Sequence, residues 1–503
     1  MSVADGSLRL TRAGIDTYQQ PIVYMHRDCH VCRAEGFAAL TRVHIRCGER
    51  ELVATLNVVT DDRLDLHSAA LSNVAWSRLQ PGLEARGTFS HAEAPASTHA
   101  LRTKVFGGRL ADSEFLNLMQ DTVDNRLSEL ELAAFVTACA GDRLDHAETL
   151  GLTRAMLAVG ERLDWGAGAV LDKHCVGGLP GNRTTPIVVA IVAAAGYRIP
   201  KTSSRAITSP AGTADTMEVM APVALDLPAM RRVVERENGC VVWGGAVRLS
   251  PADDVLIQVE RPLDFDSDGQ LVASVLSKKL AAGSSHVLID IPVGPTAKVR
   301  SDAAAQGLSA RLRSTAVALG LTLETLVTDG TQPVGIGIGP ALEAHDVLAV
   351  LRGTEGAPVD LRRRALRLAG ALLDLAPGAT PGRGEETAAS MLASGAAWRK
   401  FLAICEAQGG FREPGVAPQS VPFIAARSGR LQAFDNRRLA KVAKLAGAPL
   451  GRTAGVVCRR RVGDWIESGT PLFWIHAESM GERDYALRYA NAHPDILQLE
   501  SAP

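Results

Sequence analysis

Apolar positions follow two different periods along this chain of 503 residues. Between residues 8 and 90, short apolar and β-branched runs such as PIVYM, TRVHIRC and ELVATLNVV are separated by turn residues, and a Pro-, Gly- and Ser-rich segment follows. Such runs are typical of short strands. We therefore expect residues 1–95 to form a small β-rich domain with an extended exit.

From residue 96 to 165, apolar residues instead recur every three or four positions. The segments EFLNLMQDTV, SELELAAFVTACAG and HAETLGLTRAMLAVGERL each follow this spacing. The pattern predicts several short amphipathic helices, with Asp112 or Ser113 as the N-cap of the first. We expect an all-helical domain here.

Residues 166–415 alternate strand and helix patterns. The continuous apolar run Pro186–Gly196 has the length and small residues of a buried helix, and the hydroxyls before it predict its cap. Further on, VVW, a helix opened by Ser267 or Asp268, and HVLIDIPVG read as strand, helix, strand. This order predicts an α/β domain in which both faces of a parallel sheet are covered. We expect a loop at 377–390 and then a helix to about Ala407.

Composition limits the partners of the protein. A formal net charge of −1 gives no field that would attract nucleic acid. The segment MSVADGSLRL lacks the apolar core of an export signal, and no run approaches the roughly 20 apolar residues of a membrane span. We expect a cytoplasmic protein that binds neither nucleic acid nor membrane.

Eight cysteines are spread along the chain, mostly as single residues in apolar surroundings, which favours reduced thiols. Cys29 and Cys32 form a C-x-x-C pair with histidines nearby. The pair is compatible with half a zinc site, with a redox pair, or with one short helix that turns at Gly36.

The strongest chemical signal lies between Asp172 and Asp215. A charged trio, DKH, precedes a loop with several glycines, where backbone N–H groups can approach an anion without Cβ interference. A second turn, SSRAITS, follows the apolar run and leads to Gly212-Thr213. Since a helix N-terminus also faces the first loop, we expect the two turns to close on one phosphate-like ligand.

These motifs, in this order, resemble the thymidine/pyrimidine-nucleoside phosphorylase family. The segments GNRTTP and KTSSRAITS are most similar to the AMP phosphorylase branch of this family. The resemblance implies an α/β fold in which a parallel-sheet nucleoside phosphorylase domain (166–415) accompanies the all-helical domain (96–165). It also implies a barrel-like N-terminal domain (1–95), a C-terminal barrel-sandwich domain (416–503) and a homodimer or larger homo-oligomer. The tight turns of the last domain are expected at Gly463 and Gly469.

The resemblance also implies phosphate ligands at matching positions of this sequence. Lys173 supplies positive charge, and its companions are Gly178, Thr185, Ser203, Ser204, Arg205, Thr208, Ser209 and Thr213. The family usually has serine where this chain has Cys175, and a thiol is a weaker donor. Inorganic phosphate is then a substrate, and no cofactor or metal is required. Lys201 and Arg205 are predicted to be available for a 5′-phosphate.

Two sets of residues are candidates for the leaving base. In the pyrimidine enzymes the matching residues are His174, whose imidazole titrates near neutral pH, with Ser274 and Lys278, which lie four residues apart on one predicted helix face. Lys279 is predicted to be solvated. In the AMP branch the match is Asp266 as proton donor, with Ser274 and Lys298 as binding residues. A loop-orienting role for His174 and a solvated acidic turn around Asp266 are the alternatives.

The sequence thus predicts a pentosyltransferase that cleaves a nucleoside-type N-glycosidic bond with phosphate. The family reaction converts thymidine to thymine and 2-deoxyribose 1-phosphate, and the branch reaction converts AMP to adenine and ribose 1,5-bisphosphate. The alternatives are a non-catalytic nucleotide-binding module and a phosphoribosyltransferase of the same fold. The latter needs acidic ligands for magnesium where this chain has DKH.

Overall fold

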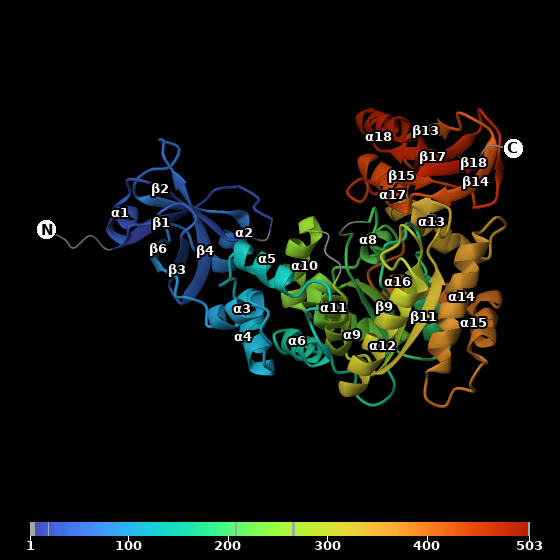
Figure 1. Cartoon of the computed structure of the whole chain (residues 1–503), viewed down its shortest axis with the longest axis horizontal. Helices are drawn as coiled ribbons and strands as arrows, with labels where there is room; N and C mark the ends of the chain where they lie inside the picture. The colour runs from blue at the N-terminus through green and yellow to red at the C-terminus, as the bar shows by residue number, and fades with distance from the viewer. Residues whose placement is uncertain (1–5, 19, 207–208, 264–266, 501–503) are drawn as a thin grey trace. The chain divides into compact units, whose positions relative to one another are not determined.

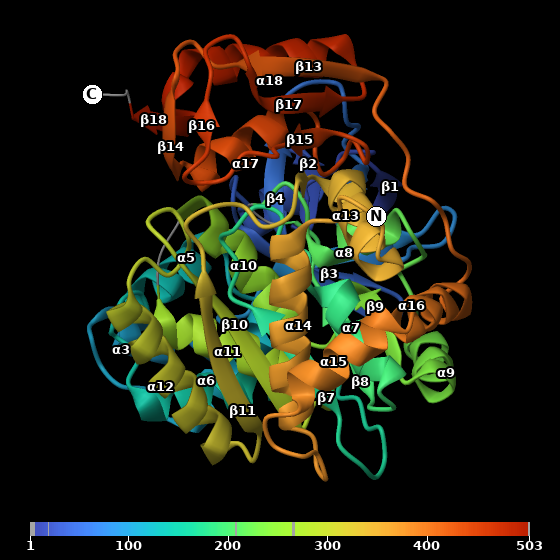
Figure 2. The ribbon, with the colours of Figure 1, turned by 90° about the vertical axis from the view of Figure 1, so that its right-hand side faces the viewer.

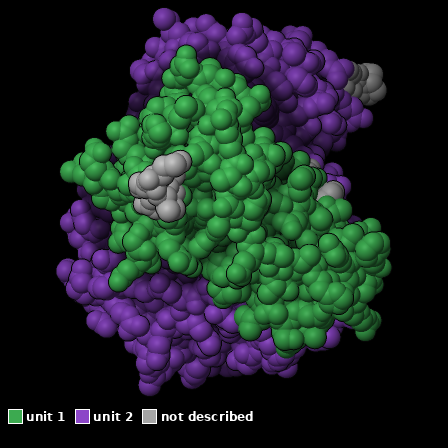
Figure 3. Space-filling model, turned by 90° about the vertical axis from the view of Figure 1, so that its left-hand side faces the viewer, with its two compact units in different colours: residues 1–143, 255–263 green, residues 144–254, 264–503 purple. Residues whose placement is uncertain are grey.

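The computed structural model describes residues 6–18, 20–206, 209–263 and 267–500. The chain divides into two compact units, Met1–Arg143 with Val255–Leu263, and Leu144–Asp254 with Asp264–Pro503. Figure 3 colours the two units separately.

The first unit contains a closed barrel of strands in the order β1-β5-β2-β4-β3-β6. Its inward positions alternate with outward ones, so Val43 and Ile45 on β3 are fully buried while Arg46 is exposed. The short helix α1 follows Cys29 and ends at Gly36, as predicted for that stretch. The elements are β1 (Ser7–Arg12), β2 (Ile22–His26), α1 (His30–Glu35), β3 (Arg42–Cys47), β4 (Arg50–Val59), β5 (Ser68–Leu71), α2 (Asn73–Leu79) and β6 (Arg86–His91).

The helical periodicity after the barrel corresponds to α3 (Thr98–Val105), α4 (Asp112–Val123), α5 (Glu129–Ala138) and α6 (His146–Ala158). The predicted N-cap of α4 is wrong. Its N-cap is Ala111, whose N–H donates to the Glu114 carboxylate at 2.8 Å, so a side chain inside the helix replaces a capping hydroxyl. Helix α6 lies in the second unit, against α11 and α12.

The second unit is built on a parallel sheet, as predicted. Strand β10 (His286–Val293) pairs in parallel with β11 (Thr322–Asp329) and with β7 (Leu171–Cys175). Strands β8 (Ile199–Ser203) and β9 (Gly239–Trp243) also pair in parallel, and a parallel bridge from Val170 to Arg198 joins the two sets. All carboxyl ends therefore point to one edge, where α/β sheets bind ligands.

Helices cover both faces of this sheet. The apolar run predicted as a buried helix is α7 (Thr185–Ala194), which packs against α14 (Val359–Asp374) and α16 (Ala396–Ala407). Figure 2 looks onto α14, which lies over the strands. Helices α11 (Asp268–Ala281) and α12 (Asp302–Ala318) pack on the other side. Alternate residues of β10 join the two cores, Leu288 with α7 and Val287 with α11.

The remaining helices of this region are α8 (Thr213–Glu218), α9 (Leu227–Glu237), α13 (Pro340–Arg352) and α15 (Gly384–Ala393). Helix α10 (Pro251–Leu263) begins in the second unit, but its residues from Val255 onward are assigned to the first. Helix α10 was not predicted. The loop predicted at 377–390 is shorter than expected, since α15 begins at Gly384. Ser267 caps α11 by accepting from Gln270 N, as predicted.

The C-terminal segment forms one sheet in the order β12-β15-β17-β13 and a second in the order β16-β14-β18. Strand β12 precedes α13 in the chain, so its pairing with β15 fastens this segment to the α/β body. The elements are β12 (Gly337–Ile338), β13 (Gln419–Ile424), β14 (Gly429–Phe434), α17 (Asn436–Leu445), β15 (Gly455–Val457), β16 (Trp465–Ile466), β17 (Pro471–Ala477), α18 (Met480–Ala492) and β18 (Leu497–Glu500). The barrel-sandwich form stays a prediction.

Candidate active site

The predicted phosphate loops follow neighbouring strands at the carboxyl edge of the parallel sheet, whose strands β9 and β11 are labelled in Figure 1 and whose strands β7, β8 and β10 are labelled in Figure 2. The glycine loop follows β7, the serine turn follows β8, and the segment containing Lys298 follows β10. Since all of these strands are parallel, their loops meet on one side of the sheet. The structure therefore brings together motifs that are up to 120 residues apart in the chain.

Gly178 lies in close contact with the loop that follows β10. Its φ is +83°, and a Cβ at this position would lie 2.5 Å from the backbone nitrogen of Lys298. Both facts exclude a larger side chain. The glycine loop is consequently fixed against Lys298, whose side chain is exposed.

Lys173 lies on the α7 face of β7. Its Nζ donates to Thr184 Oγ1 at 2.9 Å and lies 3.7 Å from Asp290 Oδ2, and both charged side chains are at most 1% exposed. Thr184 is the N-cap residue of α7 and a proline lies in its first turn, as predicted, but the Thr184 hydroxyl makes no capping hydrogen bond and accepts from Lys173 instead. Thr185, at the start of α7, is also buried.

Asp290 lies on the same face, within β10 and opposite Cys175 of β7. It accepts from Thr328 Oγ1 at 2.6 Å and from Asn182 Nδ2 at 3.4 Å, and the Asn182 amide also lies 3.5 Å from Cys175 Sγ. Burial and the Asp290 charge raise the pKa of Cys175 to about 12. Cys175 is therefore a neutral thiol and a weak donor at this position.

Asp172 lies on the opposite face, because side chains alternate along a strand. Lys279 Nζ donates to its Oδ2 at 2.7 Å, and Lys201 Nζ lies 3.4 Å from Oδ1. All three side chains are at most 5% exposed. Two predictions are thus wrong: Lys279 is not solvated, and Lys201 is not available for a 5′-phosphate. Both lysines are long enough to reach the one carboxylate buried under α11.

These charges change the acidity of the groups around them. Burial opposes ionisation of Asp172, but Lys201 and Lys279 hold the pKa of its carboxyl below the usual range. Burial lowers the pKa of Lys279 to about 7, against the attraction of Asp172. Burial, followed by Lys279 and Lys201, also lowers the pKa of His174 well below 6.5. The prediction that His174 titrates near neutral pH is therefore wrong, and its imidazole is neutral.

The serine turn is held by its own acidic groups. Asp215 Oδ2 accepts from the backbone N–H of Ala206 at 2.6 Å and of Gly212 at 2.8 Å, which closes the turn. Arg205 donates to both oxygens of Glu218, at 2.7 and 2.9 Å, and its guanidinium lies 4.9 Å from the centre of the Trp243 ring. Arg205 is thus occupied by a bidentate pair rather than available for a 5′-phosphate.

The hydroxyl groups of this turn lie in different surroundings. Ser203 ends β8 and is partly buried, whereas Ser204 is exposed. Ser209 Oγ donates to Ala211 O at 2.9 Å. Thr208 lies outside the described residues, as does Asp266. The phosphate contacts of the whole set stay predictions.

Arg183, which the sequence analysis did not single out, connects the two phosphate loops. It donates to Thr213 Oγ1 at 2.7 Å, to Ala211 O at 2.9 Å and to Glu343 Oε2 at 2.6 Å. Burial raises the pKa of Glu343 to about 7, against the attraction of Arg183. Arg183 is the arginine of the GNRTTP segment. Only the structure shows that its side chain reaches from the glycine loop to α8 and α13.

Ser274 and Lys278 share one face of α11, as their spacing predicted. Lys278 Nζ donates to Ser274 Oγ at 3.0 Å and to Asp253 Oδ2 at 2.7 Å. Lys278 is 28% exposed and Asp253 is 2% exposed. Asp253 of α10 therefore holds the Lys278 ammonium in one position, where solvent still reaches it. Contact between Lys278 and a base stays a prediction.

Comparison with known proteins agrees with a helical domain followed by an α/β domain. The helical bundle domain of a glycosyl transferase family matches residues 98–160, and the a/b domain of that family matches residues 167–398. The protein named "Putative thymidine phosphorylase 1" from Acidovorax sp. (strain JS42) is 61% identical over 98% of this chain and 97% of its own length. The chain belongs to the thymidine phosphorylase family. A relative from Hahella chejuensis, with the same printed name but no number, is 55% identical over 98% of both chains.

A solved structure shares the fold. Anthranilate phosphoribosyltransferase from Thermus thermophilus matches with a TM-score of 0.52 and 19% identity, over 61% of this chain and 99% of its own. With the family established, the chain is a pentosyltransferase-type enzyme.

Two further observations concern the rest of the chain. Across the described ranges, no helix has the length and apolar character needed to cross a membrane. No three His, Cys, Asp or Glu side chains among those same residues form a group that could hold a metal ion. At the C-x-x-C pair, Cys29 Sγ accepts from Cys32 N at 3.3 Å and so acts as the N-cap of α1.

Proposed function

We propose that this enzyme uses inorganic phosphate to cleave the N-glycosidic bond of a nucleoside, with thymidine as the first candidate substrate. The observation that supports this most is the meeting of the glycine loop and the serine turn at the carboxyl ends of β7 and β8. Arg183 ties these turns together, and Lys173 lies directly beneath them. Backbone N–H groups in such turns suit a phosphate.

In this mechanism a phosphate oxygen attacks C1′ of the sugar. The new C–O bond forms as the C1′–N bond breaks, and the electron pair of that bond goes to the base. Positive charge builds up on the sugar ring in between, and the bound phosphate dianion lies next to it. The role of the protein is to hold phosphate and sugar in line, and to neutralise the base as it leaves. The products for thymidine are thymine and 2-deoxyribose 1-phosphate.

His174, Ser274 and Lys278 are the proposed base contacts in this reading. Lys278 offers a positive charge to a carbonyl oxygen of the pyrimidine, on which negative charge develops. A neutral His174 donates a ring N–H to the base but does not deliver a proton as an imidazolium would. The leaving pyrimidine anion is then stabilised mainly by hydrogen bonds and by Lys278.

A second candidate is AMP phosphorolysis, and the neutral state of His174 favours it. A leaving purine needs a proton, and a group with so low a pKa is not a suitable acid at neutral pH. The aspartate that matches the proton donor of the AMP branch is Asp266, with Ser274 and Lys298 as binding residues. The products are then adenine and ribose 1,5-bisphosphate. For either reaction we expect a cytoplasmic homodimer or larger homo-oligomer.

The test is phosphate-dependent release of free base from thymidine, uridine, AMP and CMP, measured side by side on the purified protein. Release from thymidine supports the first candidate, and release from AMP or CMP alone supports the second. Asp266→Asn should then abolish AMP cleavage and leave thymidine cleavage within about threefold, since it removes a proton donor only. Binding of nucleotide without turnover of any substrate would contradict both candidates and identify a non-catalytic module.

A further inference from the structure

Arg183 joins the glycine loop to the end of the serine turn. It lies in the loop between β7 and α7, and its guanidinium reaches three other segments of the second unit. Nη1 donates to Thr213 Oγ1 at 2.7 Å and Nη2 donates to Ala211 O at 2.9 Å. Nε donates to Glu343 Oε2 at 2.6 Å. Because a guanidinium is planar and rigid, this one side chain fixes all three groups relative to one another.

The charge of Arg183 is compensated within the protein. Nη2 also lies 2.6 Å from Glu343 Oε2, and the side chains of Arg183 and Glu343 are 12% and 2% exposed. Two more contacts hold Glu343, from Gly339 N to Oε1 at 3.1 Å and from Thr216 Oγ1 to Oε2 at 3.4 Å. A cation that is already paired with a buried carboxylate adds little net charge for a ligand. Arg183 therefore acts through the groups that it holds.

The contact with Arg183 determines how the Thr213 hydroxyl can bond. A hydroxyl has one proton and two acceptor lone pairs, whereas a guanidinium can only donate. Thr213 Oγ1 must therefore accept from Arg183, and its own proton points away from the guanidinium. Within the described ranges, no protein group accepts that proton. Since Thr213 is only partly buried, an oxygen of a ligand can accept it.

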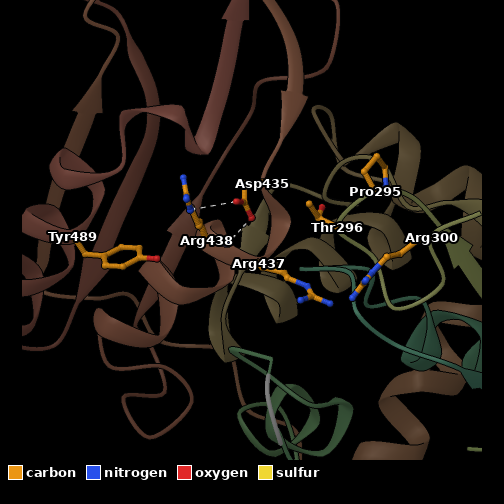
Figure 4. Close-up of a pocket in the computed structure, with 7 residues that line it drawn as sticks. All are labelled: Pro295, Thr296, Arg300, Asp435, Arg437, Arg438 and Tyr489. Atoms are coloured by element: carbon orange, nitrogen blue, oxygen red, sulfur yellow. Dashed lines mark hydrogen bonds and ion pairs between the residues drawn. The ribbon is translucent and has the colours of Figure 1, made fainter. Parts of the chain in front are cut away.

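A cavity elsewhere in the second unit takes no part in this arrangement. It has a volume of about 490 Å³, and its walls come from the loop after β10, from the start of α17 and from Tyr489 (Figure 4). Among the described residues, none from the glycine loop or the serine turn lines it. The charge of its Arg438 is balanced by Asp435, at 3.4 Å, and by Asp495, at 2.6 Å.

We propose that Arg183 is a positioning residue for the substrate phosphate, because its hydrogen bond leaves the Thr213 hydroxyl only a proton to offer to a phosphate oxygen. This inference rests on the proposed phosphorolysis, in which Thr213 contacts phosphate. Thr213 touches the anion, whereas Arg183 touches Thr213 and the backbone of the same turn, and Glu343 keeps the guanidinium in place. The oxygens of a phosphate dianion accept hydrogen bonds, so a hydroxyl that is already held as a donor needs no reorientation when the anion binds.

The experiment is a double-mutant cycle between Arg183→Lys and Thr213→Val, with thymidine or AMP as co-substrate, whichever the intact enzyme cleaves. Lysine keeps a charge beside Glu343 but lacks the fork that reaches Thr213 at the same time. Each single variant should raise KM for phosphate about tenfold, as the loss of one hydrogen bond to a charged group does. KM for the co-substrate and kcat should change less than about threefold.

The double variant separates positioning from a merely structural role. Its KM for phosphate should stay within about twofold of that of Thr213→Val, because Arg183 acts through the hydroxyl that is already absent. Thr213→Ser keeps the hydroxyl and should recover most of the loss. Arg231→Lys, at an exposed position on α9, is the matched control and should stay within about twofold of the intact enzyme. Losses that multiply in the double variant would overturn the inference, as would an unchanged KM for phosphate in Arg183→Lys.

Two other outcomes are also decisive. If the intact enzyme cleaves no substrate, the proposed phosphorolysis fails, and calorimetry with inorganic phosphate then measures the same cycle as Kd. Weaker binding in both single variants, with no further loss in the double variant, supports positioning, and an intact protein that binds no phosphate overturns it. If Arg183→Lys does not fold, Arg183→Met/Glu343→Gln takes its place in the cycle, since it removes both charges of the buried pair together.

Discussion

Asp172→Asn is the substitution that we expect to damage the fold most. Asp172 is the carboxylate that Lys201 and Lys279 share beneath α11, at 3.4 and 2.7 Å. The variant keeps the size of the side chain and removes only its charge. Two buried ammonium groups then lose their common counter-ion, whereas no packing contact is lost.

The size of the effect follows from burial. Breaking a buried ion pair by removing one partner costs about 3–5 kcal/mol, because the other charge stays buried without compensation. The pKa of Lys279 is already lowered to about 7, so the variant partly escapes this cost by releasing a proton. In the intact protein the folded state binds fewer protons than the unfolded state between about pH 7 and 10.5, so this lysine makes stability rise with pH. The deficit of Asp172→Asn should therefore be largest at or below neutral pH and should narrow toward pH 10.

The assay is urea unfolding at pH 7, followed by tryptophan fluorescence, with the transition of the second unit fitted on its own. Trp165 and Trp243 report on this unit. The exposed Asp62, replaced by Asn, is the control and should stay within about 0.5 kcal/mol of the intact protein. The double variant Asp172→Asn/Lys279→Met removes one of the two uncompensated charges and should recover about half of the loss. If Asp172→Asn unfolds within about 1 kcal/mol of the control, the ammonium groups do not depend on this carboxylate and the reasoning is refuted.

Three further expectations concern the loops and the base contacts. Burial raises the pKa of Glu343 to about 7, so the folded state holds its proton longer than the unfolded state and stability falls as pH rises from about 4.5 to 7. Glu343→Gln should remove this slope from the pH dependence of Tm. An unchanged slope would show that Glu343 is not the group that causes it. Gly178→Ala should lower kcat/KM for phosphate by about a hundredfold, because the added Cβ collides with the Lys298 backbone; activity within about threefold of the intact enzyme would show that the loop yields. Lys278→Met should raise KM for the base-containing substrate about tenfold, measured by steady-state kinetics, while Tm changes by only a few degrees. An unchanged KM would exclude contact between Lys278 and the base.

The architecture was predictable because each layer has its own pattern of apolar residues. The run Pro186–Gly196 is apolar all round, as a helix must be when it packs on both a sheet and further helices. The strand HVLIDIPVG is also nearly all apolar, as expected for a parallel strand covered on both faces. The single carboxylate in that strand, Asp290, was a signal that the prediction did not use. A charge in a fully buried strand requires a partner, and Lys173 is that partner.

The contacts of long charged side chains could not be predicted from spacing. Ser274 and Lys278 were placed correctly because they lie on one helix and the rule is local. The same spacing rule assigned Lys279 to solvent. The sequence of α11 does not show that the helix face carrying Lys279 packs against Asp172 on β7. Arg183 likewise depends on α13, which begins more than 150 residues later. These errors have one cause: each partner is contributed by a distant element.

The distant partners also explain how a site made of loops is held in shape. Asp172 links β7 to β8 and α11 through Lys201 and Lys279, and Lys173 links β7 to β10 through Asp290. These pairs lie beneath the loops rather than in them, so ligand binding does not have to break them. Donors that are fixed in advance need no reordering while charge develops on the sugar, which is the condition for electrostatic catalysis. Conversely, a variant that removes one of these buried ion pairs should shift the loops above the pair. Its kcat is therefore expected to fall even though the exposed residues of the site are unchanged.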